Sequence, residues 1–200
     1  MQKTTIFGGE NVSIQLVGDY FDDCLKAAQN FCQEQGAHFL SPFDDADVIE
    51  GQASVAVEIE RQLGSTPDHI VLPVGGGGLS SGLLSYFGTT SQFTLVEPLG
   101  GACLWAALIA GKPVKLDKVD TFADGAAVGQ IGQRTFECLK SIGLANVLRI
   151  PEDRICITML EMLNIEGIVL EPAGALAIDA LKDLGLSLIH ISEPTRPLYI

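Results

Sequence analysis

The chain has 200 residues, of which 47% are apolar and 18% charged, and its formal net charge is −13. This composition is typical of a globular protein with a large core. The acidic excess disfavours nucleic acid and anionic membrane surfaces as partners, because both attract lysine and arginine. No apolar run is long enough to cross a bilayer, and the first residues lack the basic and apolar regions of a signal peptide.

Five cysteines are spread along the chain, none close-paired and none near a histidine at metal-ligand spacing. Such a pattern indicates a reducing compartment, so we expect a cytoplasmic protein. We predict that all five are reduced core thiols: Cys24, Cys32, Cys103, Cys138 and Cys156.

The first 43 residues predict a βαβ unit, with strands at 12–17 and 37–40 around a helix that ends before Gly36. Asp19 is the expected N-cap, and Asp22 and Asp23 suit the first turn, where the helix dipole favours carboxylates. A helix over 48–63 follows, opened by three aspartates. Gly51 lies inside it and indicates a close approach by another segment, since glycine is costly in a helix.

The most informative stretch is an apolar strand, 70–74, that leads directly into Gly75, Gly76, Gly77 and Gly78 and then into a helix over 79–87. Glycines let a backbone approach an anion and turn its N–H groups inward, and the helix N-terminus adds a positive potential. The stretch therefore predicts a phosphate-binding loop.

Strands and helices alternate through the rest of the chain, with Pro151 and Pro172 expected as first helical residues. The predicted strands are 93–96, 146–150 and 168–170, and the predicted helices are 100–109, 131–141, 152–163 and one beginning at 171–175. This alternation predicts an α/β fold, with a mostly parallel twisted sheet covered by helices on both faces.

Two ligands suit the glycine loop. A dinucleotide site needs G-x-G-x-x-G, but Gly75-x-Gly77 is followed by Ser80, although Glu97 stands where an acid would meet a ribose. The alternative is pyridoxal phosphate, and here the loop Pro73 to Leu79 resembles that of fold-type II pyridoxal-phosphate enzymes.

Within that group the chain resembles the threonine dehydratase family. Five stretches carry the resemblance, in family order over residues 3 to 185: Leu16–Asp23, Pro42–Asp45 with Val48–Gln52, the glycine loop, Phe122–Val128 and Glu171–Leu176.

The resemblance implies a tryptophan-synthase-beta-like fold in which residues 1–43 end a small domain and 44–185 form most of a large cofactor-binding domain. It also implies β-elimination of water from L-threonine to give 2-oxobutanoate and ammonia, in isoleucine biosynthesis, by a homo-oligomer. A serine dehydratase or serine racemase of the same family remains an alternative, as does a Rossmann-like nucleotide-binding domain.

The family's cofactor-binding lysine lies in a Ser-x-Lys-type motif, and no lysine of this chain lies in one. We therefore expect an internal, inactive fragment with no catalytic residue of its own.

By resemblance, backbone groups of Gly75, Gly76, Gly77, Gly78 and Leu79 bind the cofactor phosphate. Gly125 and Glu171 would lie near the cofactor ring. It is equally consistent with the sequence that Gly125 only forms a turn and that Glu171 is only an acidic residue before a helix. Glu97 is a weak candidate for a structural cation, because the family's aspartate is replaced by Cys103, and hard cations prefer oxygen.

Residues 186–200 do not continue the pattern. The stretch from Leu186 to Arg196 resembles the translation of an adapter used in DNA library preparation, so we expect a non-native tail.

Overall fold

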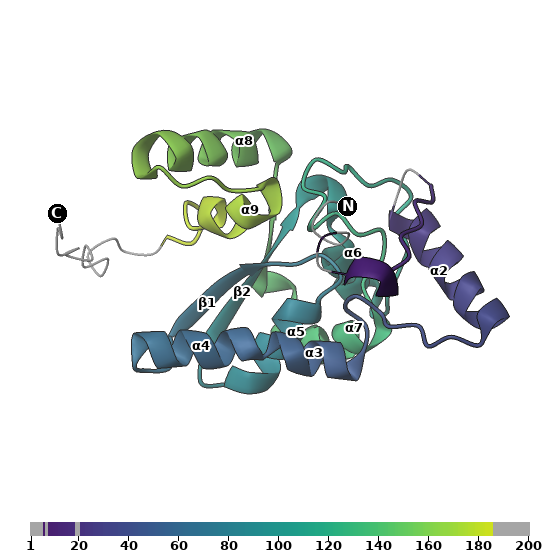
Figure 1. The fold of residues 1–200 in the computed structure, drawn as a ribbon. Helices are drawn as coiled ribbons and strands as arrows, with labels where there is room; N and C mark the ends of the chain where they lie inside the picture. Colours follow the sequence, from purple (N-terminus) through teal and green to yellow (C-terminus); the bar gives the residue numbers. More distant parts are fainter. Residues whose placement is uncertain (1–5, 7, 19–20, 186–200) are drawn as a thin grey trace. The chain divides into compact units, whose positions relative to one another are not determined.

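The computed structural model describes residues 6, 8–18 and 21–185. These residues fall into two compact units that divide between Ser41 and Pro42 (Figure 1). The division lies near the predicted boundary between residues 43 and 44. That the two parts are the family's small and large domains stays a prediction. The proposed adapter-derived tail, 186–200, lies outside the described residues.

The first unit contains the 3₁₀ helix η1 (Gly9–Asn11) and helix α2 (Phe21–Gln35), which ends at Gly36 as predicted. The strands predicted at 12–17 and 37–40 were wrong, and with them the βαβ unit. No described residue of this unit is buried; Leu16 is 73% and Leu40 62% exposed. Strands need hydrogen-bonded neighbours and apolar cover, and these segments have neither among the described residues. The expected N-cap, Asp19, is not described.

The second unit is built on three parallel strands in the order β1 (His69–Pro73), β2 (Gln92–Pro98), β3 (Val147–Ile150). Leu72 pairs with Leu95, and Leu95 with Val147. The predicted parallel sheet is confirmed, but the strand predicted at 168–170 is not present. That segment pairs with no described strand and leads into the last helix, with Val169 83% exposed.

Helices cover both faces of this sheet (Figure 1), because side chains along each strand alternate between two apolar clusters. Phe93 and Leu95 pack with α5, α6 and α7, whereas Val96 and Ile150 pack with α8 and α9. The helices of this unit are α3 (Ala46–Gln52), α4 (Ser54–Leu63), α5 (Gly78–Phe87), α6 (Cys103–Ala110), α7 (Gln133–Leu139), α8 (Glu152–Glu161) and α9 (Pro172–Ala180). Short 3₁₀ turns η2 (Leu99–Gly101), η3 (Lys140–Ile142) and η4 (Leu144–Asn146) and the π-turn η5 (Met162–Glu166) connect them.

Several helix ends differ from the sequence prediction. The helix expected over 48–63 is two helices, α3 and α4, that meet at Ala53, and Asp45 caps the first of them through the N–H groups of Asp47 and Val48. Pro172 is the first residue of α9, as predicted, but Pro151 precedes α8 as its N-cap. No described helix is long and apolar enough to span a bilayer.

The prediction of five core thiols was wrong for four of them. All five cysteines are free, but only Cys103 is buried; Cys24 and Cys156 are exposed. Cys156 follows Ile155, which takes the inward position on α8. Helix periodicity places one neighbour inside and the other outside, and the sequence alone does not decide which.

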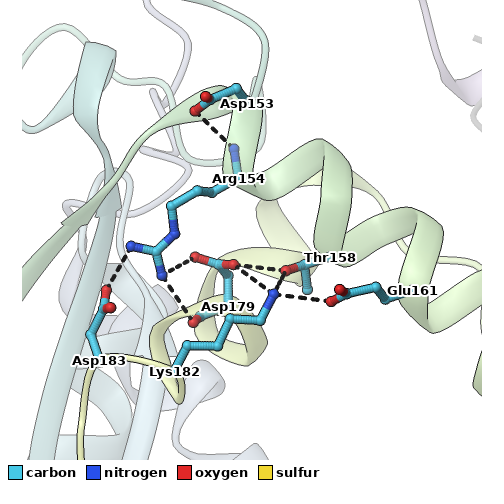
Figure 2. Close-up of polar contacts among 7 residues, drawn as sticks. All are labelled: Asp153, Arg154, Thr158, Glu161, Asp179, Lys182 and Asp183. Carbon is cyan, nitrogen blue, oxygen red and sulfur yellow. Dashed lines mark hydrogen bonds and ion pairs between the residues drawn. The ribbon is translucent and has the colours of Figure 1, made fainter.

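A polar cluster joins α8 to α9 (Figure 2). Asp179 of α9 is fully buried, and its Oδ1 accepts a hydrogen bond from the Thr158 hydroxyl at 2.7 Å. Arg154 Nη2 lies 2.8 Å from Asp179 Oδ2, and Lys182 Nζ lies 3.3 Å from Oδ1. Arg154 also pairs with the exposed Asp183 at 2.9 Å. Two cations therefore compensate one buried carboxylate between the two helices.

Candidate functional site: the glycine loop

The glycine loop joins the carboxyl end of β1 to the N-terminus of α5. Val74 still belongs to the sheet, since its N–H donates to the Val96 carbonyl at 2.8 Å. Gly77 then takes a left-handed conformation, φ +89°, directly before α5 begins at Gly78. Only glycine adopts this conformation readily, so the sharp entry into the helix depends on it.

The N–H groups of this loop are unusually free. Within the described part of the chain, Gly76, Gly77, Gly78 and Leu79 donate no backbone or side-chain hydrogen bond, and no side chain caps α5. The first N–H groups of a helix have no partner inside it. Four donors at a positive helix end therefore suit an anion such as a phosphate group.

The loop is packed so closely that side chains would not fit. A Cβ atom at Gly76 would lie 2.2 Å from the Phe43 ring, and one at Gly75 would lie 3.0 Å from the Ala126 Cα atom. Such distances require the neighbours to move. The glycines are thus needed for packing, whatever the loop binds.

The structure brings the other two predicted cofactor neighbours to the same region. Ala126, against Gly75, belongs to a turn closed by its N–H and the Ala123 carbonyl at 2.8 Å. Gly125 is in that turn, and a Cβ atom there would lie 3.4 Å from Glu171 Oε1. Glu171 is the N-cap residue of α9. The glycine loop, Gly125 and Glu171 are therefore neighbours in space; their contact with a cofactor stays a prediction.

Three contacts of the loop were missed by the sequence analysis. Phe43 lies against Gly76 and Gly78, the Thr135 hydroxyl donates to the Gly76 carbonyl at 2.7 Å, and the Cys103 thiol donates to the Gly75 carbonyl at 3.4 Å. Phe43 belongs to a stretch that carried the family resemblance, which was a signal for it. Thr135 and Cys103 had none, because they come from distant parts of the chain.

Glu97 caps a helix from the end of β2. Its two carboxylate oxygens accept hydrogen bonds from the N–H groups of Leu104, at 2.7 Å, and Trp105, at 2.8 Å, in the first turn of α6. The side chain is fully buried. The ribose contact considered for Glu97 was therefore wrong. Among the described residues no group of three acidic, histidine or cysteine side chains is arranged to hold a metal ion.

Burial raises the pKa of Glu97 from 4.5 to about 7, although the two backbone N–H groups, Cys103 and the Arg149 charge act in the opposite direction. Burial, followed by the charge of Glu97, also raises the pKa of the Cys103 thiol. This thiol is therefore protonated at neutral pH, and its one proton has two acceptors nearby, the Gly75 carbonyl at 3.4 Å and the Glu97 carboxylate.

The raised pKa of Glu97 predicts a pH-dependent stability. Between about pH 4.5 and 7 the folded protein holds the Glu97 proton more tightly than the unfolded chain does, so the free energy of unfolding falls as pH rises. The loss attributable to this group is about 3 kcal/mol, from ~1.4 kcal/mol per pKa unit. Urea unfolding of the wild type and of Glu97→Gln at pH 5 and pH 8 measures it. From pH 5 to pH 8 the wild type should lose more free energy of unfolding than the variant. An equal change in the two proteins would contradict this assignment.

Comparison with known proteins agrees with this architecture. The family model described as pyridoxal-phosphate dependent enzyme matches residues 1–190. The L-threonine dehydratase biosynthetic IlvA of Bacillus subtilis is 41% identical over 184 residues, which cover 90% of this chain and 43% of that protein. The chain thus spans less than half the length of this relative.

Solved structures share the fold. The processed form of threonine deaminase isoform 2 from Solanum lycopersicum has 34% identity and a TM-score of 0.74, over 82% of this chain and 48% of that one. Serine racemase from Dictyostelium discoideum has 26% identity and a TM-score of 0.72, over 90% of this chain and 58% of that one. With its parallel sheet and glycine loop, the chain belongs to the fold-type II pyridoxal-phosphate dependent enzymes.

Proposed function

We propose that the glycine loop, from Gly75 to Leu79, binds the phosphate group of pyridoxal phosphate. The observation that carries this proposal is the set of four N–H groups, from Gly76 to Leu79, that have no acceptor within the described residues. They lie at a helix N-terminus, in a loop whose packing leaves no room for side chains. These features fit the phosphate of the cofactor that the family uses.

We further propose that the protein carrying this chain converts L-threonine to 2-oxobutanoate and ammonia, the first step toward isoleucine. The Bacillus relative is named for this activity and shares 41% of the aligned residues. Bound pyridoxal phosphate acts as an electron sink at Cα of an amino acid, which makes a β-hydroxyl a leaving group. The part of this chain is to bind and orient the cofactor through the glycine loop, with Gly125 and Glu171 beside its ring.

Serine is the competing substrate. The structural similarity to a serine racemase at 26% identity keeps a serine dehydratase or racemase as the second candidate. Among the solved structures the identity to the threonine deaminase is higher, 34% against 26%, which favours threonine. We place the protein in the cytoplasm, as a homo-oligomeric enzyme of branched-chain amino-acid biosynthesis with small amino acids as its substrates.

A chimeric enzyme tests this function. The aligned segment of the Bacillus threonine dehydratase is replaced by the corresponding residues of this chain. We expect a purified chimera that forms 2-oxobutanoate from L-threonine faster than pyruvate from L-serine. A folded chimera that prefers serine would overturn the assignment to threonine, and one that acts on neither would overturn the assignment to the dehydratases.

Two glycine variants of the chimera distinguish an effect on the glycine loop from a general effect of replacing a glycine in this fold. Gly76→Ala, which forces a Cβ atom against Phe43, should abolish activity and the visible absorbance of bound cofactor. Gly51→Ala, which meets nothing within 4 Å, is the matched control and should leave both unchanged. Cofactor bound normally in the Gly76 variant would contradict the proposed phosphate site.

A further inference from the structure

Two carbonyl groups of the glycine loop accept hydrogen bonds from side chains of the second unit. The buried Thr135 hydroxyl lies 2.7 Å from the Gly76 oxygen and 3.3 Å from the Gly132 oxygen. A hydroxyl has a single proton to donate, so the shorter contact, to Gly76, is the stronger bond. The Cys103 thiol donates to the oxygen of the preceding residue, Gly75, at 3.4 Å. Two consecutive peptide groups are thus held by side chains from two different helices, α7 and α6.

Because the peptide bonds are trans, the contacts of these carbonyl groups also fix the direction of the N–H groups that could bind an anion. The carbonyl of a trans peptide bond and the N–H that follows point in opposite directions. Holding the Gly76 carbonyl against Thr135 therefore turns the Gly77 N–H away from α7. Holding the Gly75 carbonyl against Cys103 turns the Gly76 N–H away from α6. Both N–H groups are among the four that have no acceptor in the described chain.

The two donors are themselves fixed. The N-terminus of α7 is capped by Asp44, whose carboxylate accepts from the N–H groups of Arg134, at 2.7 Å, and Thr135, at 3.2 Å. The N-terminus of α6 is held by Glu97, just after Cys103. Each donor therefore sits in the first turn of a helix that is anchored by a carboxylate from another part of the chain.

We infer that Thr135 and Cys103 are positioning residues, which set the direction of the N–H groups that bind the phosphate. Without them the two peptide groups are free to rotate, and a glycine loop has no side chains to prevent this. Thr135 contributes more, since a hydroxyl at 2.7 Å is a stronger donor than a thiol at 3.4 Å. This inference rests on the proposed role of the loop.

The test uses the 200-residue chain labelled with ¹⁵N and ¹³C, and pyridoxine 5′-phosphate, which lacks the aldehyde and so cannot react with lysines. Pyridoxine without phosphate is the ligand control. In the wild type we expect saturable shifts of the amide signals of Gly76 and Gly77 with the phosphate ester only. Thr135→Val should weaken the ester's affinity about tenfold and move the Gly76 carbonyl signal; Thr135→Ser, which keeps the hydroxyl, should restore both.

Cys103→Ala and Cys103→Ser form a second pair, directed at the Gly76 N–H, and they decide the question if Thr135→Val does not fold. Cys103→Ala should reduce the amide shift of Gly76 while Cys103→Ser retains it. If a folded Thr135→Val or Cys103→Ala variant binds the ester with wild-type affinity and shows the wild-type amide shifts, the inference about positioning is overturned. The proposed phosphate site would still stand in that case. No loop shift in the folded wild type would instead overturn the proposed phosphate site, and the inference with it.

Discussion

Replacing Gly82 by alanine is expected to destabilise the second unit by about 3 kcal/mol, the upper part of the range for overpacking. Gly82 lies inside α5, where the junction of α3 and α4 crosses it. A Cβ atom there would lie 2.7 Å from the Ile49 carbonyl oxygen and 2.8 Å from the Ala53 nitrogen. Both are backbone atoms, so the helices must separate to accommodate the methyl group. The urea midpoint of the purified chain measures the effect.

Gly51→Ala is the matched control for Gly82→Ala. Gly51 is also helical, but a Cβ atom there meets nothing within 4 Å. Its replacement should stabilise the protein by about 0.5–1 kcal/mol, through helix propensity alone. The glycine in α3 was expected to mark a close approach, but that approach occurs at Gly82. Equal midpoints for the two variants would contradict this close packing of α5.

Replacing Arg154 by alanine is expected to cost about 3 kcal/mol, because it leaves the buried carboxylate of Asp179 with less compensating charge. Asp179 is fully buried, whereas Arg154 and Lys182 are 33% and 47% exposed. Lys182 still pairs with Oδ1, but Oδ2 faces only Arg154 among the described residues. Chemical unfolding of the variant measures this loss.

A double-mutant cycle identifies the buried charge as the cause. In an Asp179→Asn background, where no buried charge remains, Arg154→Ala should cost about 1–3 kcal/mol less than in the wild type. Asp183→Asn removes the exposed partner of Arg154 and should cost less than about 1 kcal/mol. An additive cycle would show that the cluster of Figure 2 has no energetic coupling between α8 and α9.

The parts of the fold that the sequence predicts well are those whose evidence is local. Apolar runs identified β1, β2 and β3, and glycines marked the ends of α4 and α6, where Gly64 and Gly111 have positive φ. Hydrophobic alternation and left-handed conformations are properties of short segments. The strands predicted at 12–17, 37–40 and 168–170 failed because a strand depends on a partner. An apolar run indicates a local preference for extended structure. It does not show whether a neighbouring strand is available to pair with it.

The prediction that the glycine loop binds a phosphate comes from its residues alone, because the property that matters is the lack of side chains. Glu97 shows the limit of this reasoning. Its place after β2 suggested a ribose contact or a cation, but its carboxylate is used by α6. The sequence shows that a carboxylate stands at the end of a strand. It does not show which donors the fold brings to it.

The sequence by itself determined the family and the parallel sheet and predicted an anion-binding loop, because each follows from short motifs and their spacing. Only the tertiary structure decided what holds the loop in place. Cys103 and Thr135 act on carbonyl groups 28 and 59 residues away along the chain. Hydrogen bonds form between groups that are close in space, and packing of α6 and α7 on the sheet produces that closeness. No local pattern encodes it.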